Sequence, residues 1–354
     1  MRTVELEIND VAFGGNAVGR ASGKAVFVPF AIDGERVRAE IVREKKNFAE
    51  ADLVEVLAAS PRRTKPECPY FGRCGGCGYQ HIDYAHQLEL KRRQVEQVLR
   101  RIGKLEVEVQ PMIPSPKPYA YRNRVTVHCE GGVIGYYRYD AHQLIDVTHC
   151  PIAAPEVNAA LADLRARKPR DGHYALRAHS GPRVFEQTND EVAEALAQFV
   201  TDSLPNDQQL LIDAYCGAGF FTKRLREKFA RVIGIEWDRY AVAAAQENAA
   251  PNESYISGDV DLELSRQLIA ADPATTTIIV DPPATGLSSA ARHALLDRPM
   301  NTLIYVSCNP ATLARDLKEL QPRYDILSVT PFDMFPQTAE IEAVAIVRRR
   351  DADR

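Results

Sequence analysis

The chain contains the stretch Thr302-Leu-Ile-Tyr-Val-Ser-Cys-Asn-Pro-Ala-Thr-Leu-Ala-Arg-Asp316, an apolar run of strand type followed by a turn and a helix pattern. The turn carries Cys308 directly after the run 303–306. Open α/β sheets bind their ligands at the carboxyl ends of strands, and a helix amino terminus favours a thiolate. The pattern therefore indicates a nucleophilic cysteine, with a small buried thiol that only packs as the alternative.

Residues before this stretch predict further strands of the same parallel sheet. Residues 210–214 are an apolar run that leads into Cys216-Gly-Ala-Gly219 and a helix, the arrangement of nucleotide-binding domains. Three later strand patterns end in Glu236, Asp259 and Asp281. Glu236 is placed to accept ribose hydroxyls, and Asp259 could reach an adenine edge.

The glycine turn distinguishes between two classes of cofactor. A dinucleotide-binding enzyme would need a third glycine at the position of Thr222. Strands that end in acidic residues, together with the motif Asp281-Pro-Pro, favour S-adenosylmethionine as the cofactor instead. We therefore expect the last part of the chain to be a Rossmann-like domain that binds this cofactor.

Length and composition bound the class of protein. With 354 residues and 45% hydrophobic content, the chain can bury a sizeable core in two or three domains. No apolar run approaches the roughly 20 residues of a membrane span, and the first residues do not resemble a signal peptide. Seven unevenly spaced cysteines do not suit a secreted disulfide scaffold. We expect a monomeric cytoplasmic protein with no membrane partner.

Positive charge is unevenly distributed along the chain. The net charge of −4 argues against attraction of the whole protein to nucleic acid. Residues 67–127, however, hold 10 Lys and Arg against 6 Asp and Glu. Residues 91–104 have the pattern of a basic amphipathic helix, which is either a phosphate-binding face or simply a solvated one.

The first part of the chain predicts a separate small domain. Residues 3–58 alternate in strand fashion between turn signals, as in small closed β-barrels that bind oligonucleotides, although a structural role is the alternative. The polar stretch Ser60-Pro-Arg-Arg-Thr-Lys-Pro66 marks a boundary. We expect three domains: 1–60, 61–180 and 181–354.

Four cysteines have the spacing of a metal centre. Cys68, Cys74 and Cys77 are separated by five and then two residues on a glycine-rich loop, and Cys150 is a fourth candidate. Zinc would favour two closely spaced pairs of cysteines. Three-plus-one spacing, with prolines after Cys68 and Cys150, favours a 4Fe-4S cluster over zinc.

The middle of the chain predicts antiparallel strands in a central α+β domain. Residues 119–127 and 135–139 interleave aromatic side chains with arginines, notably in Tyr121-Arg-Asn-Arg124. Aromatic rings can stack on RNA bases while guanidinium groups hold phosphates. The alternative is that these rings belong to the core.

Four motifs, taken together, carry a specific resemblance: Asp213-Ala-Tyr-Cys-Gly-Ala-Gly219, Asp281-Pro-Pro, Ser307-Cys-Asn-Pro-Ala-Thr-Leu-Ala-Arg-Asp316 and Asp333-Met-Phe-Pro-Gln-Thr-Ala-Glu-Ile-Glu342. They closely resemble the RNA (uracil-C5)-methyltransferase family, most of all the 23S rRNA (uracil-5-)-methyltransferases. The segment Gly14-Gly-Asn-Ala-Val-Gly19 resembles the TRAM barrel of such enzymes. The resemblance implies an α/β fold with a TRAM barrel, a central RNA-binding domain and a C-terminal class I methyltransferase domain.

The resemblance also implies roles for individual residues. Cys308 matches the nucleophile of the family, and Glu342 matches its base. Positions that contact S-adenosylmethionine in the family match Gln187, Tyr215, Phe220, Glu236, Asp259 and Asp281. The cluster ligands match Cys68, Cys74, Cys77 and Cys150. The implied reaction is methyl transfer to C5 of a uridine through a covalent bond between Cys308 and C6 of the base.

The RNA substrate and the enzyme class have alternatives. A barrel together with a cluster loop is more similar to the ribosomal RNA members, but some transfer RNA members carry the cluster. A cytosine-C5 RNA enzyme would have a second cysteine where Ala284 stands, and a non-catalytic RNA-binding protein would lack Cys308 or Glu342. Two residues depart from the family pattern: Ala284, where many relatives have Arg or Lys, and Glu340, where many have His.

Overall fold

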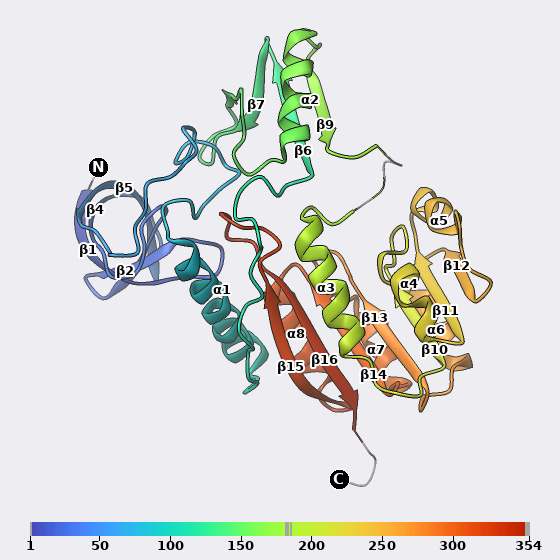
Figure 1. The fold of residues 1–354 in the computed structure, drawn as a ribbon. Helices are drawn as coiled ribbons and strands as arrows, with labels where there is room; N and C mark the ends of the chain where they lie inside the picture. Colours follow the sequence, from blue (N-terminus) through green and yellow to red (C-terminus); the bar gives the residue numbers. More distant parts are fainter. Residues whose placement is uncertain (1, 181–183, 185, 351–354) are drawn as a thin grey trace. The chain divides into compact units, whose positions relative to one another are not determined.

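The computed structural model describes residues 2–180, 184 and 186–350, and Figure 1 labels most of its helices and strands. The chain divides into two compact units. The first consists of Met1–Gln94, Ser115–Ser180 and Phe335–Glu340, and the second of Val95–Pro114, Gly181–Met334 and Ile341–Arg354. In the described part of the chain, no helix is long and apolar enough to cross a membrane.

The first unit begins with the predicted barrel. Its strands close in the order β1-β2-β3-β5-β4, and their inward side chains, such as Leu6, Val26 and Val37, are buried. Gly19 allows the first two strands to approach, because a Cβ there would lie 2.9 Å from the Glu7 carbonyl oxygen. The barrel strands are β1 (Arg2–Val11), β2 (Ala17–Ala21), β3 (Lys24–Val28), β4 (Arg36–Glu44) and β5 (Phe48–Ala58).

A second sheet in this unit has the order β8-β7-β6-β9. Helix α2 covers one of its faces, where Val127, Ile134 and Leu161 form a buried core (Figure 1). The elements are β6 (Arg124–Glu130), β7 (Val133–Tyr137), β8 (Leu144–Asp146), α2 (Pro155–Ala166) and β9 (Gly172–Arg177). The antiparallel pairing confirms the predicted mixed α and β content of the middle of the chain.

The second unit is built on a seven-stranded sheet in the order β12-β11-β10-β13-β14-β16-β15. Adjacent strands from β12 to β14 are parallel, and β16 runs antiparallel between β14 and β15. This confirms the predicted Rossmann-like domain. The strands are β10 (Leu210–Ala214), β11 (Arg231–Glu236), β12 (Glu253–Ser257), β13 (Thr276–Val280), β14 (Thr302–Ser307), β15 (Tyr324–Phe332) and β16 (Glu342–Arg349).

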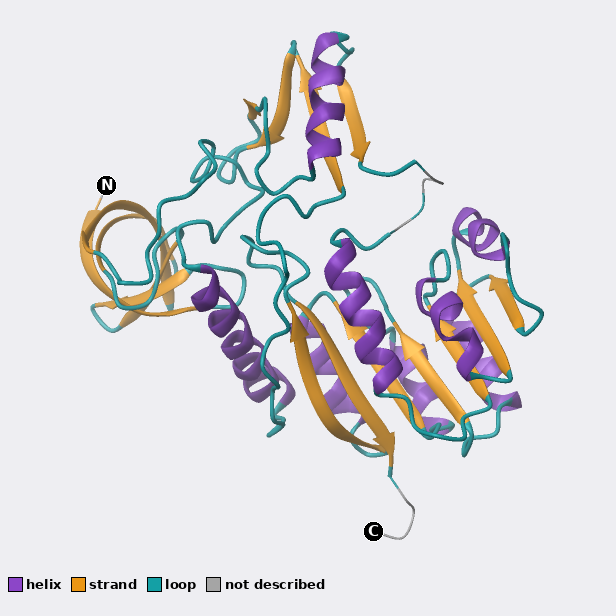
Figure 2. Ribbon diagram, in the orientation of Figure 1, coloured by secondary structure: helices purple, strands orange, loops and turns teal. Residues whose placement is uncertain are grey.

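Helices lie on both faces of this sheet, with α3 and α4 in front and α6, α7 and α8 behind in Figure 2. Burial on both faces explains why β13 and β14 are apolar along their whole length rather than alternating. The helices are α3 (Asp190–Asp202), α4 (Phe220–Leu225), the 3-10 turn η2 (Arg226–Lys228), α5 (Arg239–Gln246), α6 (Val260–Ala270), α7 (Ser289–Asp297) and α8 (Pro310–Leu320).

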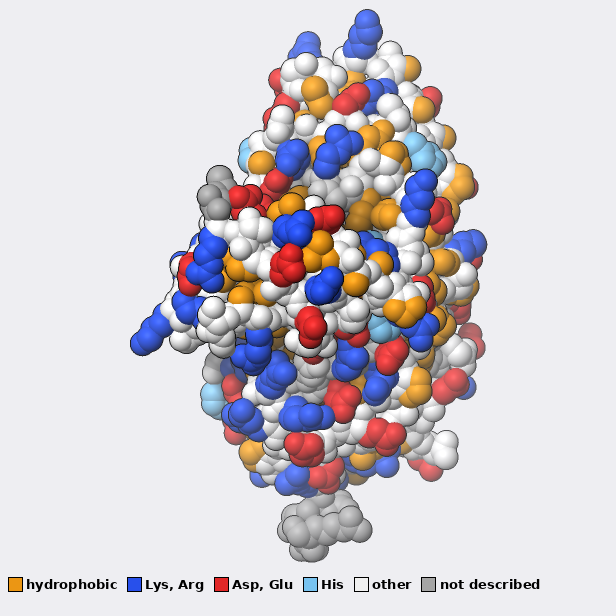
Figure 3. Space-filling model, turned by 90° about the vertical axis from the view of Figure 1, so that its left-hand side faces the viewer, with side chains coloured by type: hydrophobic (Ala, Val, Ile, Leu, Met, Phe, Trp, Pro, Cys, Tyr) orange, Lys and Arg blue, Asp and Glu red, His pale blue; other side chains and the backbone are white. Residues whose placement is uncertain are grey.

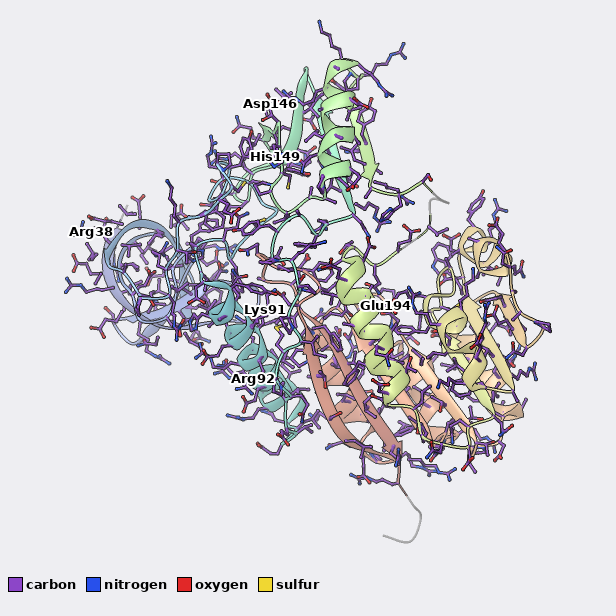
Figure 4. All side chains as sticks on the ribbon, viewed as in Figure 1. Arg38, Lys91, Arg92, Asp146, His149 and Glu194 are labelled. Carbon is purple, nitrogen blue, oxygen red and sulfur yellow. The ribbon has the colours of Figure 1, made fainter. Side chains whose placement is uncertain are left out.

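The predicted basic helix differs from the one observed. Helix α1 (Tyr84–Val98) continues into a π-helical turn, η1 (Leu99–Gly103), that ends at Lys104 in a left-handed conformation. Lys91 lies on α1 beside Arg92 (Figure 4), but its side chain is fully buried and its Nζ donates a hydrogen bond to the Phe335 carbonyl oxygen at 3.0 Å. The basic residues of 91–104 therefore do not all lie on one solvent-exposed face, because the buried Lys91 ammonium group has a structural role.

The three-domain division stays a prediction. All barrel strands fall within the expected 1–60 segment, whereas contacts group the barrel and the second sheet into one unit. The expected boundary after residue 180 adjoins residues 181–183, which lie outside the described part of the chain.

A substitution at Gly135 tests how closely β7 and β8 pack. A Cβ at this position would overlap the Ile145 carbonyl oxygen and lie 2.9 Å from the Val147 nitrogen. We expect Gly135→Ala to destabilise the first unit by about 1–3 kcal/mol, the usual cost of overpacking. Gly78→Ala is the control, since nothing lies within 4 Å of the added atom. Equal thermal unfolding midpoints for the two variants would contradict the described strand pairing.

Candidate active site

The carboxyl ends of five parallel strands bring the predicted site residues to one edge of the sheet. Strands β10 to β14 end at residues 214, 236, 257, 280 and 307. Tyr215, Glu236, Asp259, Asp281 and Cys308 therefore all lie at or just beyond the same edge. This is the edge at which open α/β sheets bind their ligands.

A tight glycine turn follows β10 and holds the acid of the next strand. Gly219 has φ +86°, and a Cβ there would lie 2.7 Å from the Thr222 hydroxyl oxygen, so glycine is required. The carboxylate of Glu236 is 8% exposed and accepts hydrogen bonds from the backbone nitrogens of Gly217 at 3.1 Å and Asp238 at 2.9 Å. These bonds fix the carboxylate while leaving lone pairs for a ligand.

The remaining predicted cofactor residues come from four elements. Asp259 is exposed and caps α6, because its Oδ1 accepts from the nitrogens of Asp261 and Leu262 at 3.0 and 3.2 Å. Phe220 begins α4, with the Arg224 guanidinium 4.2 Å from its ring centroid. Tyr215 donates to the Asp261 carboxylate at 3.4 Å. Gln187 is partly buried in the loop before α3.

Two carboxyl groups at the centre of the sheet retain protons unusually well. Asp213 is fully buried: its Oδ2 accepts from the Thr222 nitrogen at 3.1 Å, while its Oδ1 has no partner among the described residues. Burial raises the pKa of Asp213 well above its usual value, and the charges of Asp281 and Glu236 add to this. Asp281 keeps some exposed surface, but the protein packed around its carboxyl group raises its pKa to about 7.

The register of β14 and β16 brings the predicted nucleophile and the predicted base to the same end of one strand pair. Ser307, the last residue of β14, pairs with Ala343, and these strands are antiparallel. Cys308 directly follows Ser307, and Glu342 directly precedes Ala343. Cys308 is exposed on the turn, whereas Glu342 is only 3% exposed. An accessible thiol and an enclosed carboxyl group therefore lie at the same end of this strand pair.

Helix α8 holds the loop that follows Asp281. The Asn309 side-chain nitrogen and the Thr312 hydroxyl both donate to the Ala284 carbonyl oxygen, at 3.0 and 3.1 Å. Arg315 donates from Nη2 to the Thr285 carbonyl oxygen at 3.0 Å. The turn that carries Cys308 and the loop after Asp281 are therefore fastened to each other through one helix.

Asp316 is the buried acceptor behind this loop, and sequence reasoning missed it. Its carboxylate has no exposed surface and accepts from the Tyr305 hydroxyl at 2.7 Å, the Leu287 nitrogen at 2.8 Å and the Arg292 guanidinium at 3.2 Å. Arg315 donates to it from Nε at 2.8 Å. An available signal was that Asp316 falls on the apolar face of α8, between buried leucines.

The four predicted ligand cysteines line one cavity in the first unit, of about 300 Å³. Burial raises the pKa of each thiol, to about 12 for Cys77. Within the described residues, no three His, Cys, Asp or Glu side chains are arranged so as to hold a metal ion. The structure thus gathers the thiols around a common space without showing a metal centre.

Tyr121 and two cysteines outside the predicted ligand set have packing roles. Tyr121 is 5% exposed and its hydroxyl donates to the Pro336 carbonyl oxygen at 3.0 Å, so its ring belongs to the core. Cys129 and Cys216 are both buried. The aromatic stripe is therefore only partly a surface feature.

Two protein-family models match the chain. The model described as tRNA (Uracil-5-)-methyltransferase matches residues 170–257 and 263–350. The TRAM domain model matches residues 1–54, which include most of the barrel.

Relatives and a solved structure match nearly the whole chain. An uncharacterized RNA methyltransferase of Thermosynechococcus vestitus is 30% identical over 98% of this chain and 98% of that protein. Another, of Bdellovibrio bacteriovorus, is 32% identical over 98% of this chain and 95% of that protein. The crystal structure of Pyrococcus abyssi tRNA (uracil-54, C5)-methyltransferase in complex with S-adenosyl-L-homocysteine has a TM-score of 0.73, covering 97% of this chain and 100% of that one. At 23% identity this match shows a shared fold.

Removing the Asp316 carboxylate should release the loop after Asp281. Asp316→Ala leaves the Arg292 guanidinium and the Tyr305 hydroxyl without their buried acceptor, which we expect to destabilise the second unit by about 3–5 kcal/mol. Asp325→Ala is the control, because its ion pair with Arg350 is on the surface and worth less than about 1 kcal/mol. Denaturant unfolding measures both. A cost for Asp316→Ala no greater than for the control would contradict this role.

The raised pKa of Asp281 predicts a pH-dependent stability. Between about pH 4, where an unfolded Asp ionises, and pH 7, the native carboxyl keeps a proton that the unfolded chain has released. The free energy of unfolding of the ligand-free protein should therefore fall as pH rises through this window. Asp281→Asn should show a shallower fall, with Asp213 supplying the remainder. Urea unfolding at pH 4.5, 5.5 and 6.5 gives the free energy of unfolding of each protein. If this free energy changes equally with pH in the wild type and in Asp281→Asn, the raised pKa does not belong to Asp281.

Proposed function

This chain belongs to the RNA (uracil-5-)-methyltransferase family, and we propose that it methylates C5 of a uridine in RNA through a covalent Cys308 adduct. It is an S-adenosylmethionine-dependent RNA methyltransferase with a TRAM domain. The observation that supports the proposed roles is the strand register, which brings an exposed thiol and a buried carboxyl group to the same end of one strand pair, next to Ser307 and Ala343.

Cys308 and Glu342 divide the reaction between them. Uracil C5 is a poor nucleophile, so the Cys308 thiolate adds to C6 and moves electron density onto C5. S-adenosylmethionine supplies the electrophilic methyl group that C5 accepts. Glu342 then removes the C5 proton, and the electrons of that C–H bond restore the C5–C6 double bond as the C6–sulfur bond breaks. The thiolate is regenerated, and the proton remains on Glu342 until it passes to solvent.

The proposed cofactor site comprises Gln187, Tyr215, Phe220, Glu236, Asp259 and Asp281. Glu236 suits a ribose diol, because its carboxylate is already oriented by two backbone donors. Asp213 beneath the turn has an unpartnered buried oxygen, as expected where polar groups are arranged for a ligand-binding turn. Asp281, beside the loop held by α8, is placed to orient either the cofactor or the pyrimidine.

We propose that Cys68, Cys74, Cys77 and Cys150 hold a 4Fe-4S cluster of structural purpose. All four line the same cavity. The three-plus-one spacing of these cysteines, with prolines after Cys68 and Cys150, is the feature that favours the cluster over zinc. The methylation steps above are complete without an electron donor, so the cluster would organise the fold of the first unit.

The proposed substrate is 23S ribosomal RNA, with transfer RNA as the second candidate. The combination of a TRAM barrel with a cysteine loop is the feature that favours ribosomal RNA. Transfer RNA is favoured by the shared fold with the Pyrococcus abyssi enzyme, whose name gives uracil-54 of tRNA as its target. The target base must leave its stack before either reaction, at a cost of a few kcal/mol.

The open face of the sheet β8-β7-β6-β9 is the proposed RNA contact of the central region. Tyr137 and His142 are stacked with ring centroids 4.1 Å apart, and His128 Nδ1 lies 2.6 Å from His173 Nδ1. Burial and the neighbouring His173 lower the pKa of His128 below its usual value, which favours its neutral ring, and this ring suits base stacking. By contrast, acids accompany many basic side chains on the face in Figure 3, and Arg38 of the barrel (Figure 4) pairs with Glu5 and Glu55.

Variants of Cys308 and Glu342 test the proposed reaction. Labelled S-adenosylmethionine is incubated with bulk ribosomal and transfer RNA from a strain lacking the gene. We expect label as 5-methyluridine in ribosomal RNA, lost about a thousand-fold or more with Cys308→Ala. Glu342→Gln should slow release about 100-fold or more and accumulate a covalent protein–RNA complex.

Glu340→Gln is the control for the base, because Glu340 is exposed and only two residues away. It should keep wild-type activity. Label found in transfer RNA instead would support the proposed reaction but show that the substrate is transfer RNA. Full activity of Cys308→Ala would contradict the covalent mechanism. If wild-type protein that carries its cluster labels neither RNA, a non-catalytic role is favoured.

A further inference from the structure

Tyr136 carries a buried hydroxyl that the protein does not satisfy. The residue lies on β7 and lines the cavity that the four cysteines share. Its hydroxyl oxygen is enclosed and has no hydrogen bond of normal geometry within the described structure. Leaving such a group unpaired costs about 1–3 kcal/mol, so it requires an explanation.

Gln80 presents a second unsatisfied donor to the same cavity. Its side chain is 2% exposed, and its Oε1 accepts from the Cys68 backbone nitrogen at 3.0 Å. Because a backbone N–H can only donate, this bond fixes which end of the amide is oxygen. The other end, Nε2, is buried without a partner among the described residues and must donate to something else.

Both donors lie at the cavity of the four cysteines. Tyr136 and Gln80 line it together with Cys68, Cys74, Cys77 and Cys150. They come from separate segments of the chain, since Tyr136 lies on β7 and Gln80 follows the glycine-rich loop. Two independent segments therefore each direct an unsatisfied hydrogen-bond donor to one cavity lined by thiols.

We propose that Tyr136 and Gln80 donate hydrogen bonds to the sulfur atoms of the cluster and thereby raise its reduction potential. The inference rests on the 4Fe-4S cluster proposed above. A hydrogen bond withdraws electron density from a cluster sulfur and lowers the cost of the extra negative charge in the reduced state. It also gives both buried donors the acceptor that the protein itself lacks. Both are positioning residues, which act through the ligand atoms.

The test is a redox titration of the full-length protein purified without oxygen, followed by electron paramagnetic resonance. Tyr136→Phe and Gln80→Met each remove one donor. Each should shift the midpoint potential to a more negative value, and a tenfold change in the one-electron equilibrium corresponds to 59 mV. Tyr137→Phe is the matched control, since its hydroxyl donates to Glu130 at 2.7 Å from the opposite face of the strand.

Iron and sulfide contents are measured on the same samples. Potentials of Tyr136→Phe and Gln80→Met that equal those of the wild type and Tyr137→Phe, at full iron loading, would overturn the proposal. If one variant fails to fold or loses iron, the other still decides, because the two donors belong to separate segments of the chain. Finding zinc instead of iron in the wild type would contradict both the 4Fe-4S cluster and the proposed hydrogen bonds to it. The proposed methyl transfer is tested separately, by the assay with labelled S-adenosylmethionine.

Discussion

The antiparallel insertion of β16 between β14 and β15 is the constraint on which the proposed site depends. Parallel strands alone would bring only carboxyl ends to the ligand edge. Because β16 runs in the opposite direction, its first residue, Glu342, arrives at that edge beside the turn after Ser307. The proposed nucleophile and the proposed base, which are 34 positions apart in sequence, thus come to the same end of one strand pair through backbone pairing.

Helix α8 extends this constraint to the rest of the edge. Its amino end supplies the turn of Cys308, its first two turns hold the loop after Asp281, and Asp316 anchors that loop from beneath. Burial of Asp316 is tolerated because two guanidinium groups and a hydroxyl satisfy it. Rigid support of this kind is what a reaction with two precisely placed groups requires.

Sequence patterns predicted the strands, the glycine turn and the acids at strand ends, because these depend on local periodicity. They did not reveal the burial of Lys91, since a basic stretch gives no sign that an aliphatic stem passes through the core to the Phe335 carbonyl. They also missed the partners of Asp316, which come from separate segments of the chain. Likewise, Tyr121 follows the same aromatic pattern as Tyr137, but tertiary packing buries only the former.

In the proposed reaction, Cys308 bonds to C6 of the uracil ring and Glu342 accepts the C5 proton. RNA that carries 5-fluorouridine tests it most directly, because a fluorine at C5 cannot leave as a proton and the adduct must persist. After incubation with S-adenosylmethionine, protease digestion and mass spectrometry locate the modified peptide. We expect a methylated fluorouridine nucleotide attached to the peptide containing Cys308. An adduct on another cysteine, or no adduct with an RNA whose unfluorinated form is methylated, would contradict it.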